Sequence, residues 1–316
     1  MKKRFYHFGF VCSPRNILIL ICLSGFLITQ QSPAEETMSS FLSIDADARG
    51  TAMGGAHGAI TEGIYSVYWN PAGLSEVLFK EIGATYHRAF QDINYSFIGY
   101  ATPSDFYGAL AFHVFYLGSG SITSTYENLD GSFAGTGDSF SVTDLGFGLT
   151  QSKAITENFA YGASAKIITH KIMDKSAFDL ACDVGVIYHP PVEGVKLGLA
   201  LRNFSTMYKF LNSQTREPWN IKVATAYELP MLPLTVAGDY NVFAGQKDSL
   251  SFGAEYWFFD MLALRAGTKL LSSNDLLSSL NFGFGLNLLD LYQLDYAINP
   301  NSALGISQRF SLIIKF

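Results

Sequence analysis

The histidine, cysteine, serine and acidic residues of this chain lack the spacings that catalysis or metal binding requires. Beyond residue 34 the histidines are His57, His87, His113, His170 and His189. None stands at metal-ligand spacing from another histidine or from Cys182. No Gly-x-Ser-x-Gly motif is present, and Asp45-x-Asp47 is too short for a calcium loop. We therefore expect no enzyme activity, no metal and no cofactor, with a hydrolase triad assembled from distant strands as the alternative.

Charged residues recur instead at the polar positions of segments in which polar and apolar residues alternate. They are Lys166, Asp179, Asp183, Glu255, Arg265, Lys269, Asp295 and Arg309. If residues 173–176 form a hairpin tip, Lys166 lies opposite Asp183, and His170 lies opposite Asp179. Turns centred on Asp260 and Ser302 place Glu255 opposite Arg265, and Asp295 opposite Arg309. We interpret these as scaffold ion pairs of about 0.2–1 kcal/mol each, with a solute pathway or proton relay as the alternative.

The elements that would position these charges are segments with a two-residue period. In residues 281–288, Phe282, Phe284, Leu286 and Leu288 alternate with Asn and Gly, as in a strand with one apolar face. Segments of roughly ten residues, the length of a tilted membrane strand, lie near 79–90, 93–102, 106–116, 139–151, 158–172, 177–189, 195–203, 218–228, 233–242, 249–258, 262–270, 278–288, 291–298 and 304–316. These 14 segments predict an all-β fold, a 14-stranded antiparallel transmembrane β-barrel over residues 79–316.

Side-chain polarity and loop length orient this barrel. A Lys or Arg facing lipid near mid-depth costs about 2–4 kcal/mol, so the charged face is predicted to line the lumen and the apolar face, with Cys182, to meet lipid. Periplasmic turns are short in such barrels, and we assign residues 103–105, 152–157, 190–194, 229–232, 259–261 and 289–290 to them. The longest connections, 117–138 and 204–217, then lie on the outer side of the membrane. The first is rich in Gly, Ser and Thr, which is typical of a solvated loop.

Composition and the N-terminus agree with export to a membrane. With 15% charged residues and a net charge of −6, a basic nucleic-acid binder is excluded. Residues 1–34 have a positive start, the apolar run 17–28 and small residues before a cut after Ala34, as in a cleaved signal peptide. Its removal takes away Lys2, Lys3, Arg4 and Arg15 and no acidic residue, which changes the net charge to −10. We expect an integral protein of the bacterial outer membrane, with lipid as its surroundings.

Residues 35–78 precede the alternating segments and have a different composition. The stretch 41–76 is rich in small residues, and Asn70-Pro71 favours a turn. No Lys follows the glycines in the Walker position, so a phosphate loop is not indicated. We expect a compact plug or hatch inside or beneath the barrel. Its candidate residues are Arg49, Gly54, Gly55, Trp69, Asn70, Pro71, Ala72 and Gly73.

Two motifs at this end and three short stretches at the other resemble a known family. Arg49-Gly50-Thr51-Ala52-Met53-Gly54-Gly55-Ala56, then Tyr68-Trp69-Asn70-Pro71-Ala72-Gly73-Leu74, resemble the N-terminal region of the PorV/PorQ family of FadL-like outer-membrane barrels. The stretches Leu294-Asp295-Tyr296-Ala297, Leu304-Gly305 and Gln308-Arg309-Phe310-Ser311-Leu312 are similar to that family's end. Where the family often has an acidic pair, Glu62 is followed here by Gly63-Ile64. The alternating Phe310, Leu312, Ile314 and terminal Phe316 look like the signal read by the barrel-assembly machinery.

The resemblance implies two kinds of function. One is an adaptor or shuttle of type IX secretion, which would bind the translocon or exported cargo proteins through its outer loops. The other is a FadL-type channel that admits hydrophobic small molecules through the barrel wall. An orphan structural barrel is the third hypothesis. We take the secretion adaptor as the main prediction, because a purely apolar ligand would gain little from a charged lumen.

Overall fold

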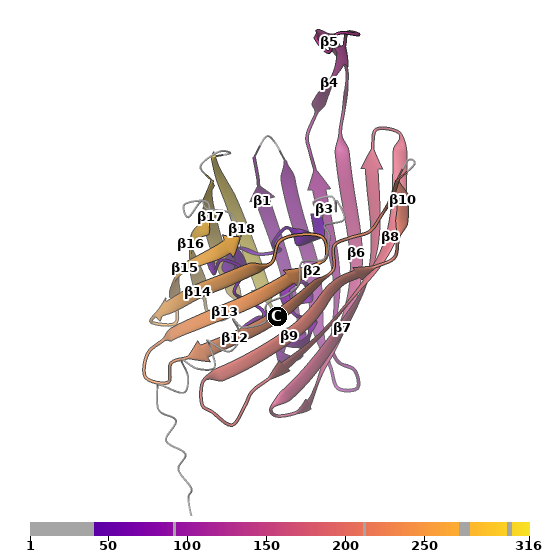
Figure 1. Ribbon diagram of the computed structural model, residues 1–316. Helices are drawn as coiled ribbons and strands as arrows, with labels where there is room; N and C mark the ends of the chain where they lie inside the picture. The colour runs from indigo at the N-terminus through magenta and orange to yellow at the C-terminus, as the bar shows by residue number, and fades with distance from the viewer. Residues whose placement is uncertain (1–40, 91–92, 211–212, 272–278, 302–304) are drawn as a thin grey trace, which may run out of the picture. The chain divides into compact units, whose positions relative to one another are not determined.

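The computed structural model describes residues 41–90, 93–210, 213–271, 279–301 and 305–316. Fourteen strands within these residues form a closed antiparallel barrel (Figure 1). They are β1 (Glu81–Arg88), β2 (Asn94–Ser104), β3 (Gly108–Gly118), β6 (Val142–Thr156), β7 (Phe159–Ile172), β8 (Lys175–Tyr188), β9 (Val195–Ser205), β12 (Asn220–Glu228), β13 (Leu234–Phe243), β14 (Ser249–Phe258), β15 (Leu262–Leu271), β16 (Leu280–Leu288), β17 (Tyr292–Asn301) and β18 (Gly305–Lys315). The predicted barrel and its strand count are confirmed.

Neighbouring residues on one strand face opposite environments, as the alternation predicts. On β7, Ile167 is 47% exposed while Ile168 is fully buried. On β8, Leu180 and Val184 are exposed, whereas Asp179 and Asp183 are buried. An exterior of exposed apolar side chains around a polar interior is the reverse of a water-soluble sheet protein and typical of a barrel in lipid.

Two connections and one strand end differ from the prediction. The long outer connection after β3 is not an open loop, because β4 (Ile122–Glu127) and β5 (Phe133–Phe140) form a separate two-stranded sheet (Figure 1). The outer connection after β9 holds a second small hairpin, β10 (Tyr208–Phe210) and β11 (Ser213–Thr215). The predicted turn 152–157 is wrong, since β6 continues to Thr156 by pairing with β7. Backbone pairing needs no alternation, and residues 152–156, Ser-Lys-Ala-Ile-Thr, show none, so the sequence pattern did not indicate that β6 continues.

The β7–β8 hairpin is offset by two residues from the predicted register. Lys166 lies opposite Ala181, where Asp183 is predicted, and the expected pairing of His170 with Asp179 is also wrong. The chain turns within residues 173–174, with Met173 at a φ of 56°. This tip is shorter than the predicted four residues, and an offset of two keeps every side chain on its face.

The two later hairpins give one correct and one incorrect pair. Glu255 lies opposite Arg265, as the turn at Asp260 predicts. Asp295 instead lies opposite Ser311, so the predicted pairing of Asp295 with Arg309 is wrong. In the described strands Asn301 lies opposite Gly305, so the register of this hairpin is shifted by two residues from the predicted one.

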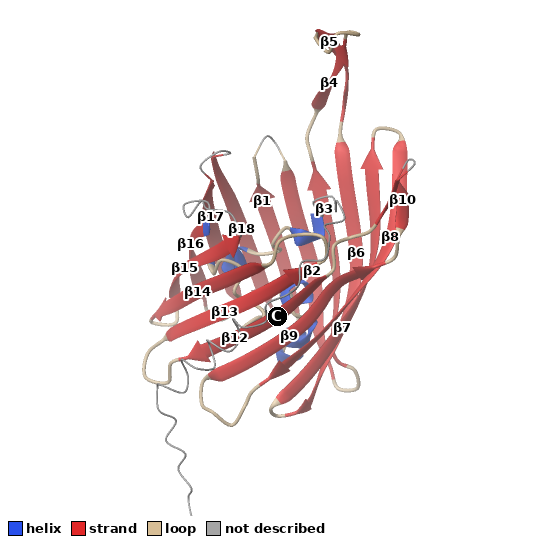
Figure 2. Cartoon of the chain, in the orientation of Figure 1, coloured by secondary structure: helices blue, strands red, loops and turns tan. Residues whose placement is uncertain are grey.

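Four short helices precede β1, and Figure 2 draws the helices in blue. They are η1 (Phe41–Ser43), α2 (Ala48–Ala52), α3 (Ser66–Trp69) and η2 (Pro71–Glu76). We call residues 41–77 the N-terminal segment. Among the described residues, no helix has the length and apolar character needed to cross a membrane. The expected signal peptide, 1–34, lies outside the described residues, as do residues 35–40.

Candidate functional site

The N-terminal segment is built around one buried carboxylate. Asp47 caps α2 by accepting the Gly50 amide at 2.9 Å, and its other oxygen accepts the Trp69 indole N–H at 2.5 Å. A Cβ on Gly50 would lie 2.3 Å from the Trp69 ring, so only glycine lets α2 approach α3 this closely. Burial raises the pKa of Asp47 to about 6. Asp47, whose type and spacing suggested at most a calcium ligand, therefore joins the motif at residues 49–56 to the motif at residues 68–74.

The Asn-Pro-Ala-Gly motif fastens this segment to β8. Asn70 Oδ1 accepts the Ala72 amide at 3.2 Å and so caps η2, which begins with Pro71. Asn70 Nδ2 donates to the carbonyls of Gly58 and Val186, both at 3.0 Å. The side chain is 1% exposed, so these bonds satisfy an amide that burial would otherwise penalise.

A chain of buried ions joins the N-terminal segment to β14, β15 and β17. Arg49 Nε and Nη2 donate to the two carboxylate oxygens of Glu255, both at 2.9 Å. Arg265 Nε donates to Glu255 at 2.5 Å, and Arg265 Nη1 donates to Asp295 at 2.6 Å. Opposite charges thus alternate from the segment into the barrel wall, and the bidentate Arg49–Glu255 contact fixes the orientation of α2.

A second anchor lies on β12 and β13. Asp239 accepts the backbone amides of His57 at 3.0 Å and Gly58 at 2.9 Å. Lys222 pairs with Asp239 at 2.8 Å and donates to the Gly55 carbonyl at 3.1 Å. Neither Lys222 nor Asp239 is among the predicted site residues. Lys222 stands between the apolar residues Ile221 and Val223, and this alternation is a sequence signal that predicts a lumen-facing side chain.

The remaining predicted motif residues also contact the wall. Gly54 has a φ of +67°, and a Cβ there would lie 2.5 Å from the backbone of Thr268 on β15. On β18, Arg309 donates to Thr51 and Ser311 accepts the Ala48 amide at 2.8 Å. The N-terminal segment therefore bonds to lumen-facing groups on several sides of the barrel.

The other predicted charges form a separate cluster toward the outer hairpins. Lys166 pairs with Asp183 at 2.7 Å despite the register offset, because a long side chain reaches diagonally. Asp179 accepts the Thr206 hydroxyl at 2.6 Å. His170 contacts Asp144 at 2.9 Å and Glu217 at 3.4 Å, and neither acid was among the predicted residues. Lys269 contributes to another polar cavity rather than to this cluster.

The candidate assembly residues lie at the end of β18. Phe310 is 53% exposed and Phe316, which follows the strand, is 58% exposed. Leu312 and Ile314 are half-buried and alternate with the buried Ser311 and Ile313. Recognition by the barrel-assembly machinery stays a prediction.

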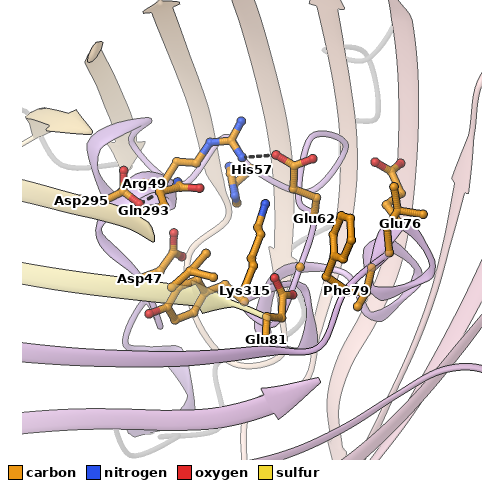
Figure 3. Close-up of a pocket in the computed structure, with 15 residues that line it drawn as sticks. Asp47, Arg49, His57, Glu62, Glu76, Phe79, Glu81, Gln293, Asp295 and Lys315 are labelled. Atoms are coloured by element: carbon orange, nitrogen blue, oxygen red, sulfur yellow. Dashed lines mark hydrogen bonds and ion pairs between the residues drawn. The ribbon is translucent and has the colours of Figure 1, made fainter. Parts of the chain in front are cut away.

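A cavity of about 210 Å³ lies at the short-turn end of the barrel, between the N-terminal segment and β1, β17 and β18 (Figure 3). Its described lining carries five carboxylates and two cationic side chains: Asp47, Glu62, Glu76, Glu81, Asp295, Arg49 and Lys315. Arg49 is held by Glu62 at 2.8 Å on the cavity side, as the dashed line in Figure 3 shows. Since short turns mark the periplasmic end, we call this cavity the periplasmic mouth.

The imidazole of His57 also lines the periplasmic mouth. It is 2% exposed, and burial lowers its pKa well below 6.5, so the ring is neutral. Its Nδ1 has no hydrogen-bond partner among the described residues. The mouth therefore offers hydrogen-bonding groups that the protein itself leaves unused.

Comparison with known proteins gives the fold. No protein-family model and no curated protein matches the sequence. Among solved structures, the Pseudomonas putida toluene transporter TodX aligns with a TM-score of 0.62 at 12% identity, over 84% of this chain and 96% of that one. The monoaromatic hydrocarbon channel CymD gives 0.62 at 11% identity, over 86% and 98%. A Pseudomonas aeruginosa FadL homologue gives 0.56 at 12% identity, over 85% and 97%.

These similarities show that the fold is that of the FadL-type channels, while the likeness to the PorV/PorQ family stays a prediction. The alignments span nearly the whole length of each channel and most of this chain. The exposed apolar exterior independently requires a lipid environment. The chain is a closed 14-stranded β-barrel of the outer membrane with the fold of the FadL-type channels.

Proposed function

We propose that this barrel is a channel for small hydrophobic molecules, with the N-terminal segment as its plug. The observation that supports this most is the full-length similarity to the toluene transporter and the monoaromatic hydrocarbon channel. Those names describe the relatives, and we transfer the substrate class as a hypothesis. The contacts of the N-terminal segment with β8, β13, β14 and β18 support its role in closing the lumen.

A route through the wall suits such a cargo better than a route along the lumen. The lumen is lined by paired charges, which offer little to an apolar molecule. A depression of about 550 Å³ lies in the wall formed by β2, β3, β6 and β7. Its large side chains, Tyr100, Phe112 and Leu149, face outward, and the small Ala163 and Ala165 lie between β6 and β8 beside them. Apolar cargo in the membrane would gain contact area there.

Uptake of radiolabelled toluene by cells that lack other FadL-type channels tests this function. Cells that produce the protein should accumulate toluene faster than cells with the empty vector. Ala165→Trp would fill the wall depression and should slow uptake several-fold. Leu199→Trp, on the outward face of β9 and 49% exposed, is the matched control and should not. Equal uptake with and without the protein would refute the channel.

The secretion-adaptor hypothesis depends only on the resemblance of the motifs at residues 49–56 and 68–74 and of the stretches within 294–312. The compared structures support the channel instead. The adaptor predicts that exported proteins or translocon components co-purify with the barrel from native membranes. This measurement is independent of toluene uptake, so the two hypotheses can be separated.

A further inference from the structure

The periplasmic mouth has more acidic than basic groups. Arg49 is already bound by Glu255 and Glu62. Asp47 and Asp295 are likewise occupied by partners inside the protein. Glu76 lies 3.7 Å from His189 Nε2, and Glu81 lies opposite Lys315, the other cationic side chain in the described lining, so five carboxylates still face two cations. A bound cation would therefore be favoured over a bound anion at this position.

Glu81 is the group whose geometry points to a ligand. It is the first residue of β1 and 3% exposed, yet its Oε1 has no hydrogen-bond partner among the described residues. Gly63, at a φ of +68°, keeps this oxygen uncovered, since a Cβ there would lie 2.7 Å from it. Burying a carboxylate oxygen without a partner is costly. A donor supplied by a ligand in the cavity would remove that cost.

The other side of the cavity is apolar. Leu78 and Phe79 line it and are 78% and 62% exposed, and the buried Ile313 lies in its wall. In Figure 3, Phe79 lies beside the group formed by Glu62, Glu81 and Lys315. A bare inorganic ion would leave these apolar side chains uncovered. An organic molecule with one charged end would use both halves of the cavity.

We propose that the periplasmic mouth binds a small primary amine in its ammonium form, with the nitrogen donating to Glu81 Oε1 and an apolar body packed on Phe79 and Leu78. Glu62 and His57, whose Nδ1 has no partner among the described residues, also line the cavity. The volume of about 210 Å³ admits a single aromatic ring with a short aminoalkyl group.

This site lies at the periplasmic end, away from the wall depression, and its amine ligand differs from the apolar cargo of the proposed channel, so the inference goes beyond the proposed function. Binding itself is measured on purified protein and transport on cells, so either can fail without the other. A barrel that binds amines but takes up no toluene would refute the channel and keep the site.

The test is isothermal titration calorimetry of the purified full-length protein in detergent at neutral pH. Benzylamine is the probe, with benzyl alcohol as its neutral analogue and benzoate as its anionic analogue. Benzylamine should bind at least 10-fold more tightly than benzyl alcohol, and benzoate should not bind. Glu81→Gln keeps the shape of the side chain and removes its charge. It should weaken benzylamine binding about 10- to 100-fold, the loss expected for a hydrogen bond to a charged group, and leave benzyl alcohol unchanged.

Glu127→Gln is the matched control, because Glu127 is an exposed glutamate on β4, outside the barrel sheet. It should bind benzylamine as the unchanged protein does. Equal affinities for benzylamine and benzyl alcohol would overturn the proposal. So would an equal effect of Glu81→Gln and Glu127→Gln, or tighter binding of benzoate.

Discussion

Replacing Glu255 with Gln should release the N-terminal segment from the barrel wall. Glu255 is 1% exposed and neutralises two cations, the buried Arg265 and the partly buried Arg49. Arg265 keeps Asp295 in the variant, whereas Arg49 keeps only the half-exposed Glu62. Removing one partner of a buried pair destabilises by about 3–5 kcal/mol, because an uncompensated charge stays buried. We expect most of this loss to fall on the segment rather than on the closed barrel.

Hydrogen–deuterium exchange of the protein in lipid nanodiscs measures this loss. A decrease of about 3 kcal/mol in local stability accelerates exchange by roughly 100-fold. The amides of residues 48–58 should show that acceleration in Glu255→Gln, while those of β6 and β7 should not. Glu127→Gln, which removes an exposed charge, should leave both regions unchanged.

A double-mutant cycle separates the ion pair from general disruption. Arg49→Gln combined with Glu255→Gln should be less damaging than the sum of the two, with a coupling energy of about 0.5–3 kcal/mol. Additive effects, or exchange of residues 48–58 that stays at the wild-type rate in Glu255→Gln, would refute the reasoning that this pair holds the segment.

The remaining predictions concern the membrane face, the motif and pH. Ile167→Lys places a charge on an outward residue of β7 and should lower the unfolding free energy in vesicles by about 2–4 kcal/mol, whereas Ser139→Lys on the exposed hairpin should change it little. Asn70→Ala removes a buried amide with three hydrogen bonds and should destabilise the N-terminal segment by about 1–3 kcal/mol, seen as faster proteolysis. The raised pKa of Asp47, about 6, means that the folded state holds this proton while the unfolded state releases it near pH 4. Stability should therefore fall as pH rises from about 4 to 6, by up to about 3 kcal/mol, and Asp47→Asn should remove that part of the pH dependence in urea unfolding.

The strands could be predicted because membrane burial leaves a strong pattern in the sequence. Each strand must present apolar residues to lipid at every second position, so Phe282 and Phe284 indicate their own orientation. A register error of two residues does not change the side of the sheet on which a side chain lies. Lys166 therefore faces the lumen as predicted, although the residue opposite it is not the predicted one. The hairpin tips were harder to predict, because the short turn at Met173 depends on a φ of 56° that the sequence does not indicate.

The contacts of the candidate site were harder to predict from the sequence. Alternation along β14 predicts that Glu255 faces the lumen. It predicts nothing about Arg49, which lies inside the barrel only because the N-terminal segment does. Their contact joins residues 206 positions apart and depends on the fold of the segment. The roles of Asp47 and Asp239, which accept backbone amides of the segment, have no spacing signature at all.

The polarity of the lumen limits how a hydrophobic molecule can use this barrel. The pairs Arg49–Glu255, Lys222–Asp239 and Lys166–Asp183 each join groups held at 2.9 Å or less. An apolar molecule passing along the axis would have to separate such pairs and leave their charges unsolvated, at several kcal/mol for each pair. A molecule held in the depression on the lipid-facing side of β3, β6 and β7 does not meet these pairs, which are buried inside the barrel. The cost of breaking these pairs therefore favours the proposed route at the wall, and variants that remove the lumen charges should alter the stability of the N-terminal segment more than they alter toluene uptake.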